Sequence, residues 1–232
     1  TSPEILHRET RIGPHYSGPA PLRACVVYPN DYHTAMSSLA VQSLYGLLND
    51  GFGVSCERCF LPSEGAMKQL QANGGPLRSI EDQTPLGGFD LLAVTTSFEL
   101  DWLNLPLMLS MGGVKPSRED RTEFDPFIIG GGPCFTANPA PVLSIFDAVY
   151  IGEIEPVVDD IRHLGEVPRG QWAEYIAERD GMFVPGHSET VSRQCAEDLG
   201  QFTTATTLLT PETEFSDAFL VELGRGCGRG CA

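Results

Sequence analysis

The sequence predicts an α/β fold in which a parallel sheet is covered by helices on both faces. Short apolar runs, typical of buried strands, alternate along the chain with segments whose apolar residues recur at helical spacing. The turns between them are rich in Gly, Pro, Asn and Asp, which favour the ends of strands and helices. Alternation of this kind is typical of a doubly wound parallel sheet with right-handed crossovers.

The first half of the predicted sheet has two strands and two helices. Residues 22–28 (LRACVVY) are a compact apolar strand that a Pro-Asn-Asp turn ends. Leucines and a valine at helical spacing predict a helix over 37–49, which Gly51 terminates. Residues 54–60 form the second strand, and Ser63 is placed to cap a short helix after it.

The second half repeats the pattern. Residues 89–95 are continuously apolar, as a strand buried on both faces should be. A helix is expected over 103–111, with Pro106 in its first turn, where proline is tolerated. The remaining strands are expected at 127–129 and 148–151, and the remaining helix of the sheet at 156–164.

The chain divides into four parts by these patterns. They are a lead-in over residues 1–21, the α/β domain over 22–165, a linker subdomain over 166–217, and the start of a second domain over 218–232. In the linker subdomain, residues 172–179 are expected to be helical and 182–184 to form a short strand.

The composition narrows the function classes. The 232 residues hold 31 acidic and 15 basic side chains, a net charge of -16, which argues against binding of a nucleic-acid backbone. No apolar run approaches the roughly 20 residues that a membrane span needs, and no secretory signal is visible. We therefore expect a cytoplasmic protein without membrane contact. Its seven cysteines suit thiols and metal ligands better than disulfides.

The most informative segment is the last one. An apolar run over 218–221, expected to be a strand, leads into LGRGCGRGCA, where Cys227 and Cys231 begin the spacing C-x-x-x-C-x-x-C. Three thiolates in that spacing leave one iron of a [4Fe–4S] cluster open, and the third cysteine would fall two positions past Ala232. The chain is thus expected to be the N-terminal portion of a larger enzyme, inactive by itself. Alternatively, Cys227 and Cys231 could be half of a zinc site or two ordinary loop thiols.

In an open α/β sheet, ligands bind beyond the carboxyl ends of the strands. The loops there supply seven candidate cofactor-binding residues: His33, Thr96, Ser97, Gly130, Gly131, Gly132 and Glu153. Each has a structural alternative. The histidine could simply be exposed, the hydroxyls could cap a strand end, the glycines could make a tight turn, and the glutamate could stabilise a helix N-terminus.

Four segments resemble one family in their order along the chain. They are the loop from Tyr32 to Leu39, IGGGPC at 129–134, FDAVYIGEIE at 146–155, and ELGRGCGRGC at 222–231. Together they resemble the N-terminal half of radical SAM proteins that carry a B12-binding domain. The resemblance covers residues 22–165 and 218–232 and is most specific at the glycine-rich and cysteine segments.

The resemblance implies a flavodoxin-like, Rossmann-like domain of the cobalamin-binding type, followed by a truncated partial TIM barrel. Cys227 and Cys231 would match the first two ligands of the [4Fe–4S] cluster. S-adenosylmethionine on the open iron would be cleaved by one electron, from a donor such as a flavodoxin or ferredoxin, to a 5′-deoxyadenosyl radical. The substrate is not implied.

His33 departs from the cobalamin pattern. The loop reads Asp31-x-His33-x-x-Met36, whereas the D-x-H-x-x-G loop has a glycine where Met36 stands. Three interpretations stay open: His33 ligates cobalamin, cobalamin binds without a protein ligand, or the domain binds no cobalamin.

Two other functions are open. A methylthiotransferase also places an α/β domain before its barrel, but the cysteines here do not fall in the asparagine-containing motif expected for its second cluster. A stand-alone flavodoxin-like regulatory module would make the terminal cysteines incidental. The pair Cys56 and Cys59 is not expected to act as a redox or zinc site, because strand alternation puts the two thiols on opposite faces.

Overall fold

The computed structural model describes residues 3–16, 18–50, 53–202 and 204–226. A six-stranded sheet in the order β3-β2-β4-β5-β6-β7 forms its centre, and all neighbours are parallel except the β6–β7 pair. The strands are β2 (Leu22–Tyr28), β3 (Val54–Phe60), β4 (Leu91–Thr95), β5 (Phe127–Gly131), β6 (Ala148–Tyr150) and β7 (Met182–Phe183). The first five strands follow the order 2-1-3-4-5 of flavodoxin-like sheets, which is compatible with a Rossmann-like fold.

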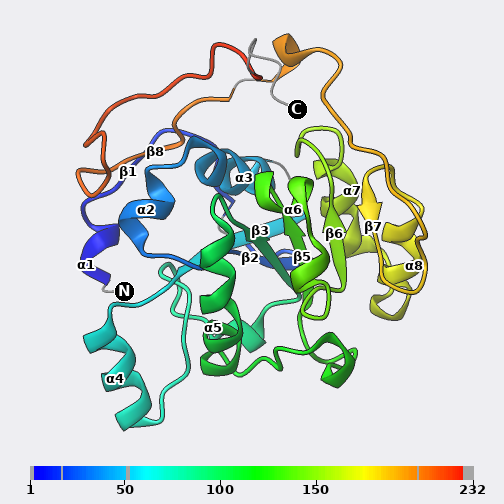
Figure 1. Cartoon of the computed structure of the whole chain (residues 1–232). Coiled ribbons are helices and arrows are strands. Elements are labelled where there is room, and N and C mark those ends of the chain that lie inside the picture. Colours follow the sequence, from blue (N-terminus) through cyan, green and yellow to red (C-terminus); the bar gives the residue numbers. More distant parts are fainter. Residues whose placement is uncertain (1–2, 17, 51–52, 203, 227–232) are drawn as a thin grey trace.

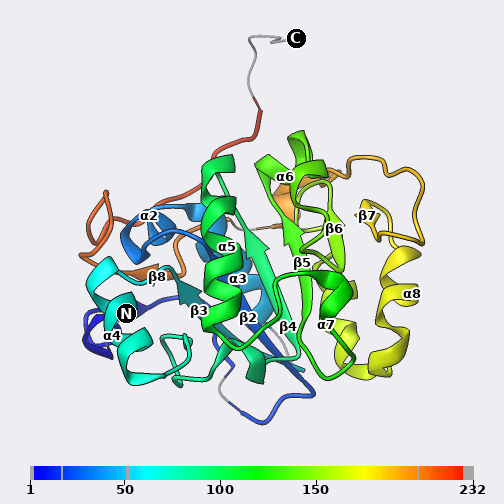
Figure 2. The same cartoon turned by 60° about the horizontal axis from the view of Figure 1, so that its bottom comes forward.

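Helices cover both faces of this sheet (Figures 1 and 2). The α-helices are α1 (Pro3–Leu6), α2 (Tyr32–Met36), α3 (Leu39–Asn49), α4 (Glu64–Asn73), α5 (Leu105–Met111), α6 (Pro133–Ala137), α7 (Val158–His163) and α8 (Trp172–Ala177). Short 3-10 turns lie at Leu86–Gly88, Glu99–Asn104, Arg118–Asp120, Ala140–Val142, Leu164–Glu166, Arg169–Gln171 and Leu199–Gln201.

Strand alternation divides the core into two layers. In β2, Ala24 and Val26 pack with α3, α7 and α8, whereas Cys25 and Val27 pack on the other face with α5 and α6. Because both faces are buried, the strands read as continuous apolar runs in the sequence. The predicted doubly wound sheet is confirmed, with element ends that differ by a few residues.

Local sequence signals explain several element ends. Ser63 caps α4 as predicted, with its hydroxyl accepting from the amide of Ala66, and Gly74 ends that helix in the left-handed conformation. Helix α4 has no buried residue and projects away from the sheet (Figure 1). Pro106 stands in the first turn of α5.

The lead-in and the linker subdomain meet in a second, two-stranded sheet. Strand β1 (Thr10–Arg11), in the lead-in, pairs antiparallel with β8 (Leu208–Leu209). After β8 the amide of Glu214 donates to Ser37 at the end of α2, and the chain then runs back past α2 and α3 toward the C-terminal end (Figure 1). Residues 3–16 are therefore part of the folded body.

One expected strand does not form. Within the described residues, the stretch 218–221 makes only a single bridge, between Val221 and Ala205. Its apolar side chains find no core here, since Phe219 and Val221 are 56% and 53% exposed. A strand of that composition needs a full-length neighbouring strand and an apolar cover, and in the described part of the chain only the short stretch 204–206 bonds to its backbone. No helix among the described residues is long and apolar enough to cross a bilayer.

Candidate functional site

A cavity of about 960 Å³ opens at the carboxyl edge of the sheet. Its floor is formed by β4 and β5, one wall by α3, and the other wall by the loop after β6 and α7. It borders the point where strand order reverses, which is where open α/β sheets bind their ligands. Its lining includes Ala40, Ser43, Thr95, Gly131, Glu153 and Arg225.

Three successive glycines serve three different purposes. A Cβ on Gly130 would lie 2.6 Å from the Phe135 ring, so Gly130 lets the aromatic layer pack against β5. Gly131 follows it on the opposite, cavity side, where an added Cβ would meet nothing closer than Tyr150 at 4.0 Å. Gly132 has φ +106°, a left-handed conformation that starts the turn into α6. All three line the cavity, so the predicted glycine site is at its edge.

The hydroxyl candidates are placed differently from the prediction. Thr96 is fully buried and Ser97 is exposed, and neither lines the cavity. Thr95, one residue earlier, does line it. The sequence pattern predicted the ligand-facing hydroxyl beyond the end of the strand, whereas the cavity extends along β4 itself, from Leu91 to Thr95.

His33 is not brought to the cavity. It is exposed on α2, a one-turn helix whose N-cap is Asp31, with Oδ1 accepting from the Thr34 amide at 2.7 Å. Met36, which stands where the cobalamin pattern has glycine, is fully buried, and the Arg58 guanidinium contacts its sulfur at 3.4 Å. The stretch expected to be a loop after the first strand is therefore a short helix, and the buried side chain of Met36 anchors it in the core. Ligation by His33 stays a prediction.

Glu153 and Glu155 face an arginine rather than the N-terminus of α7. Arg225 Nη1 lies 2.9 Å from Glu155 Oε2 and 3.1 Å from Glu153 Oε2, and Nη2 contacts Glu155 Oε1. Glu222 completes the group, with its Oε2 2.9 Å from Arg225 Nη2. The helix itself carries Asp159 and Asp160 in its first turn. The acidic pair after β6 thus binds the segment that precedes Cys227.

The electrostatics of this group follow from its burial. Burial favours the neutral acid, but the hydrogen bonds from Arg225 favour the carboxylate, so the pKa of Glu155 lies below its ordinary value. The same hydrogen bonds, to Glu155 and Glu222, raise the pKa of Arg225. Both groups are therefore charged at neutral pH.

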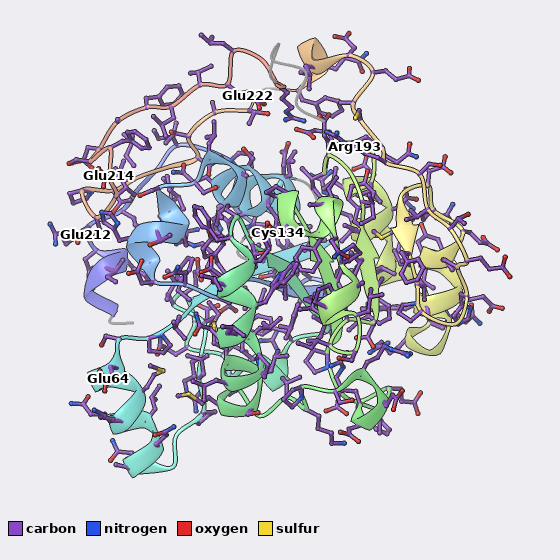
Figure 3. All side chains as sticks on the ribbon, in the orientation of Figure 1. Glu64, Cys134, Arg193, Glu212, Glu214 and Glu222 are labelled. Atoms are coloured by element: carbon purple, nitrogen blue, oxygen red, sulfur yellow. The ribbon has the colours of Figure 1, made fainter. Side chains whose placement is uncertain are left out.

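The segment around Arg193 also borders the cavity. The backbone amide of Gln194 donates to the Ile151 carbonyl at 3.0 Å, and its backbone carbonyl accepts from the Glu153 amide at 3.0 Å. Gly152 permits this contact, because a Cβ there would collide with the Gln194 backbone. Figure 3 shows Arg193 and Glu222, both of which line the cavity, on the opposite side of the picture from Glu64 on α4.

The cysteines of the described part form no metal site. Cys25 and Cys59 are buried on one face of the sheet and Cys56 on the other, which confirms that the C-x-x-C pair is split. Cys134 is buried on α6 near the centre of Figure 3, and Cys195 is exposed. No three His, Cys, Asp or Glu side chains of the described residues are grouped to hold a metal ion. Cys227 and Cys231 lie outside the described residues.

Sequence reasoning missed Thr95, the small residues of α3 and Arg225. The first two carry no signal beyond their place in the fold. Arg225 carries a signal only in its neighbourhood, as an arginine between two glycines and two residues before Cys227.

Comparison with known proteins places the chain in a family. The family described as radical SAM proteins, N-terminal, matches residues 40–185, which is more than half of the chain. An uncharacterized protein of Methanocaldococcus jannaschii, MJ0966, is 24% identical over 208 residues, covering 89% of this chain and 39% of that protein. The chain thus spans well under half of that relative's length. No solved structure gave a significant match. The chain belongs to the family of radical SAM proteins, N-terminal.

Proposed function

We propose that this chain is the cofactor-holding N-terminal part of a radical SAM enzyme. In this proposal, Cys227 and Cys231 are the first two ligands of a [4Fe–4S] cluster, and residues 218–232 begin a partial TIM barrel. The observation that carries the proposal is the contact between two segments far apart in sequence. The acidic loop at the mouth of the cavity binds Arg225, two residues before Cys227.

We propose a bulky ligand of the cobalamin type for the cavity, on the basis of its volume of about 960 Å³ and of the small side chains in part of its lining. Small side chains line it on two sides, Ala40 and Ser43 on α3 and Gly131 on β5, where no neighbour fills the space of a Cβ. Thr95 and Ser43 would supply hydroxyls to the ligand, and the turn at Gly132 lets the backbone approach it. Cobalamin, when bound, supplies a carrier for a methyl group.

The cluster supplies different chemistry, the one-electron cleavage of S-adenosylmethionine to a 5′-deoxyadenosyl radical. The protein's part is to place thiolates around the irons and to keep other thiols away from them. The four buried cysteines of the domain do not compete, because each is held within the core. The electron donor would be a flavodoxin or ferredoxin, and the cytoplasm is the expected compartment.

The cluster is tested on the protein extended beyond residue 232. After reconstitution with iron and sulfide under anaerobic conditions, we expect about four irons per chain and cluster absorption in the visible range. A Cys227→Ser variant should lose both, whereas Cys195→Ser should keep them. Absence of a cysteine three residues after Cys231 in the extended sequence would contradict the proposal.

Cobalamin is tested separately by titrating the chain with hydroxocobalamin. We expect binding that a larger side chain at Gly131 weakens, for example in Gly131→Leu. A His33→Ala variant distinguishes the mode of binding: an altered spectrum of the bound cobalamin indicates ligation by His33, and an unchanged one excludes it. No binding at all would leave the domain without this cofactor.

A further inference from the structure

Arg225 is held by carboxylates from two separate parts of the chain. Glu155, whose side chain is 2% exposed, accepts from both terminal nitrogens of the guanidinium, and Glu153 contributes a third contact from the same loop. Glu222 binds from the arginine's own segment, at 2.9 Å. A paired guanidinium and carboxylate is a geometrically specific contact. We call these four residues the Arg225 latch.

Backbone hydrogen bonds hold the residues just before Arg225, from Leu220 to Glu222. The amide of Thr206 donates to the Leu220 carbonyl, and the amide of Glu222 donates to the Thr204 carbonyl, each at 2.9 Å. The Leu220 amide donates in turn to the Thr206 hydroxyl at 2.8 Å. The chain therefore approaches the cavity along residues 204–206 before Arg225 reaches the acidic loop.

Apolar packing does not hold this segment. Phe219, Val221 and Leu223 are 56%, 53% and 98% exposed, so little apolar area is removed from water along it. After Glu222, the side-chain contacts that fix the chain are those of Arg225, since Leu223 is open to solvent and Gly224 and Gly226 have no side chains. The direction in which the polypeptide leaves the domain thus depends on the latch.

We propose that Arg225 is a positioning residue for the cluster loop. By binding Glu155 at the mouth of the cavity, it fixes where the loop carrying Cys227 begins, so that the cluster and the ligand of the cavity face one compartment. This inference rests on the proposed function. It adds that a carboxylate of the first domain, 72 positions before Cys227, sets the environment of the cluster.

The test uses the enzyme extended through its radical SAM domain, with three variants. Glu155→Gln keeps the shape of the side chain and removes its charge, and Arg225→Lys keeps the charge and loses the paired geometry. Asp159→Asn is the matched control. The Asp159 side chain is 83% exposed, and its carboxylate binds Arg162 on the same helix, α7. Hydrogen exchange of amides 220–226, iron content, and the electron paramagnetic resonance titration of the reduced cluster with S-adenosylmethionine are measured for each.

In Glu155→Gln we expect about tenfold faster exchange over 220–226, as loss of one charge-assisted hydrogen bond implies. About four irons should be retained, and the affinity for S-adenosylmethionine should be weaker, because the start of the cluster loop is no longer fixed. Arg225→Lys should lie between this variant and the wild type, and Asp159→Asn should match the wild type.

Two results would overturn the inference alone: unchanged exchange in Glu155→Gln, or faster exchange with an unchanged cluster titration. A wild-type enzyme that assembles no cluster would overturn the proposed function and this inference with it. In that case the exchange measurement still reports on the latch itself, so the two failures are distinguishable.

Discussion

Arg58 on β3 and Glu9 in the lead-in form a buried ion pair across 49 residues of sequence. Arg58 Nη2 lies 2.7 Å from Glu9 Oε2, and the two side chains are 0% and 2% exposed. Glu81 binds Arg58 Nε at 2.7 Å from the other side, and the ring of Tyr45 lies 4.7 Å from the guanidinium carbon. A buried arginine is thus neutralised by two acids from distant segments, which ties the lead-in to the sheet.

Replacing Arg58 should destabilise the domain strongly. In Arg58→Met, the carboxylates of Glu9 and Glu81 stay buried without a cation. They keep only the Tyr32 hydroxyl and the backbone amide of residue 58 as donors, and the loss of the guanidinium costs on the order of 3–5 kcal/mol. Urea unfolding measures the loss. Lys68→Met serves as a control, because its pair with Glu64 is exposed on α4 and is worth under about 0.5 kcal/mol. Adding Glu9→Gln and Glu81→Gln to Arg58→Met should recover part of the stability. If Arg58→Met alone were as stable as the wild type, this account would be contradicted.

The sheet was predictable because its strands are buried on both faces. A run such as FDLLAVT leaves little choice of structure, and glycine or proline turns mark where it ends. The ion cluster around Arg58 was not predictable, since a charged residue in the run 54–60 gives no sign of partners in the lead-in or at residue 81. Strand β7 joins the sheet through two residues only, Met182 and Phe183, too few for a periodic signal.

The candidate site was predictable in its place and less so in its residues. Topology alone directs attention to the carboxyl edge of the sheet, and the glycines at the end of β5 and Glu153 are found there. Which residue of Thr95, Thr96 and Ser97 faces the cavity depends on where the strand ends, which sequence patterns locate poorly. His33 does not line the cavity, and it lies on α2, a helix in a stretch that the sequence pattern treats as a loop.

Replacement by alanine should change the free energy of unfolding differently at two adjacent glycines. Gly130→Ala forces a Cβ to 2.6 Å from Phe135 and 2.9 Å from Phe146, and overpacking of this kind costs about 1–3 kcal/mol. Gly131→Ala meets its nearest neighbour at 4.0 Å, so its free energy of unfolding should stay within about 1 kcal/mol of the wild type. Urea unfolding of both variants gives the comparison. Equal losses at the two positions would show that the strand does not alternate as described.

Thiol labelling should separate the cysteines by burial. In a chain with Cys227→Ser and Cys231→Ser, we expect one thiol to react rapidly in the native state and four more after unfolding, because Cys195 alone among the five described cysteines is exposed. Burial also raises the pKa of Cys25, Cys56 and Cys59, so their reactive thiolates are scarce at neutral pH. Adding Cys195→Ser should remove the rapid phase. Rapid labelling of Cys56 or Cys59 would reopen the redox interpretation of that pair.

The Arg225 latch should open at low pH. The pKa of Glu155 is lower in the folded protein than the ordinary 4.5, despite burial, because of the hydrogen bonds from Arg225. Its contribution is therefore fully present above about pH 4.5 and is lost as the pH falls through the lowered value. The ratio of amide exchange rates over 220–226 in Glu155→Gln and the wild type measures this contribution, since intrinsic exchange rates cancel at each pH.

We expect that ratio to be about ten at pH 7, from the loss of a charge-assisted hydrogen bond, and to approach one well below pH 4.5, where Glu155 is protonated in the wild type as well. The exposed pair of Asp159 and Arg162 gives the control, and Asp159→Asn should show a ratio near one at every pH. A ratio in Glu155→Gln that does not change with pH would mean that shape, and not charge, holds the segment. The positioning role of Arg225 would then depend on packing at Glu155 instead of its ionisation.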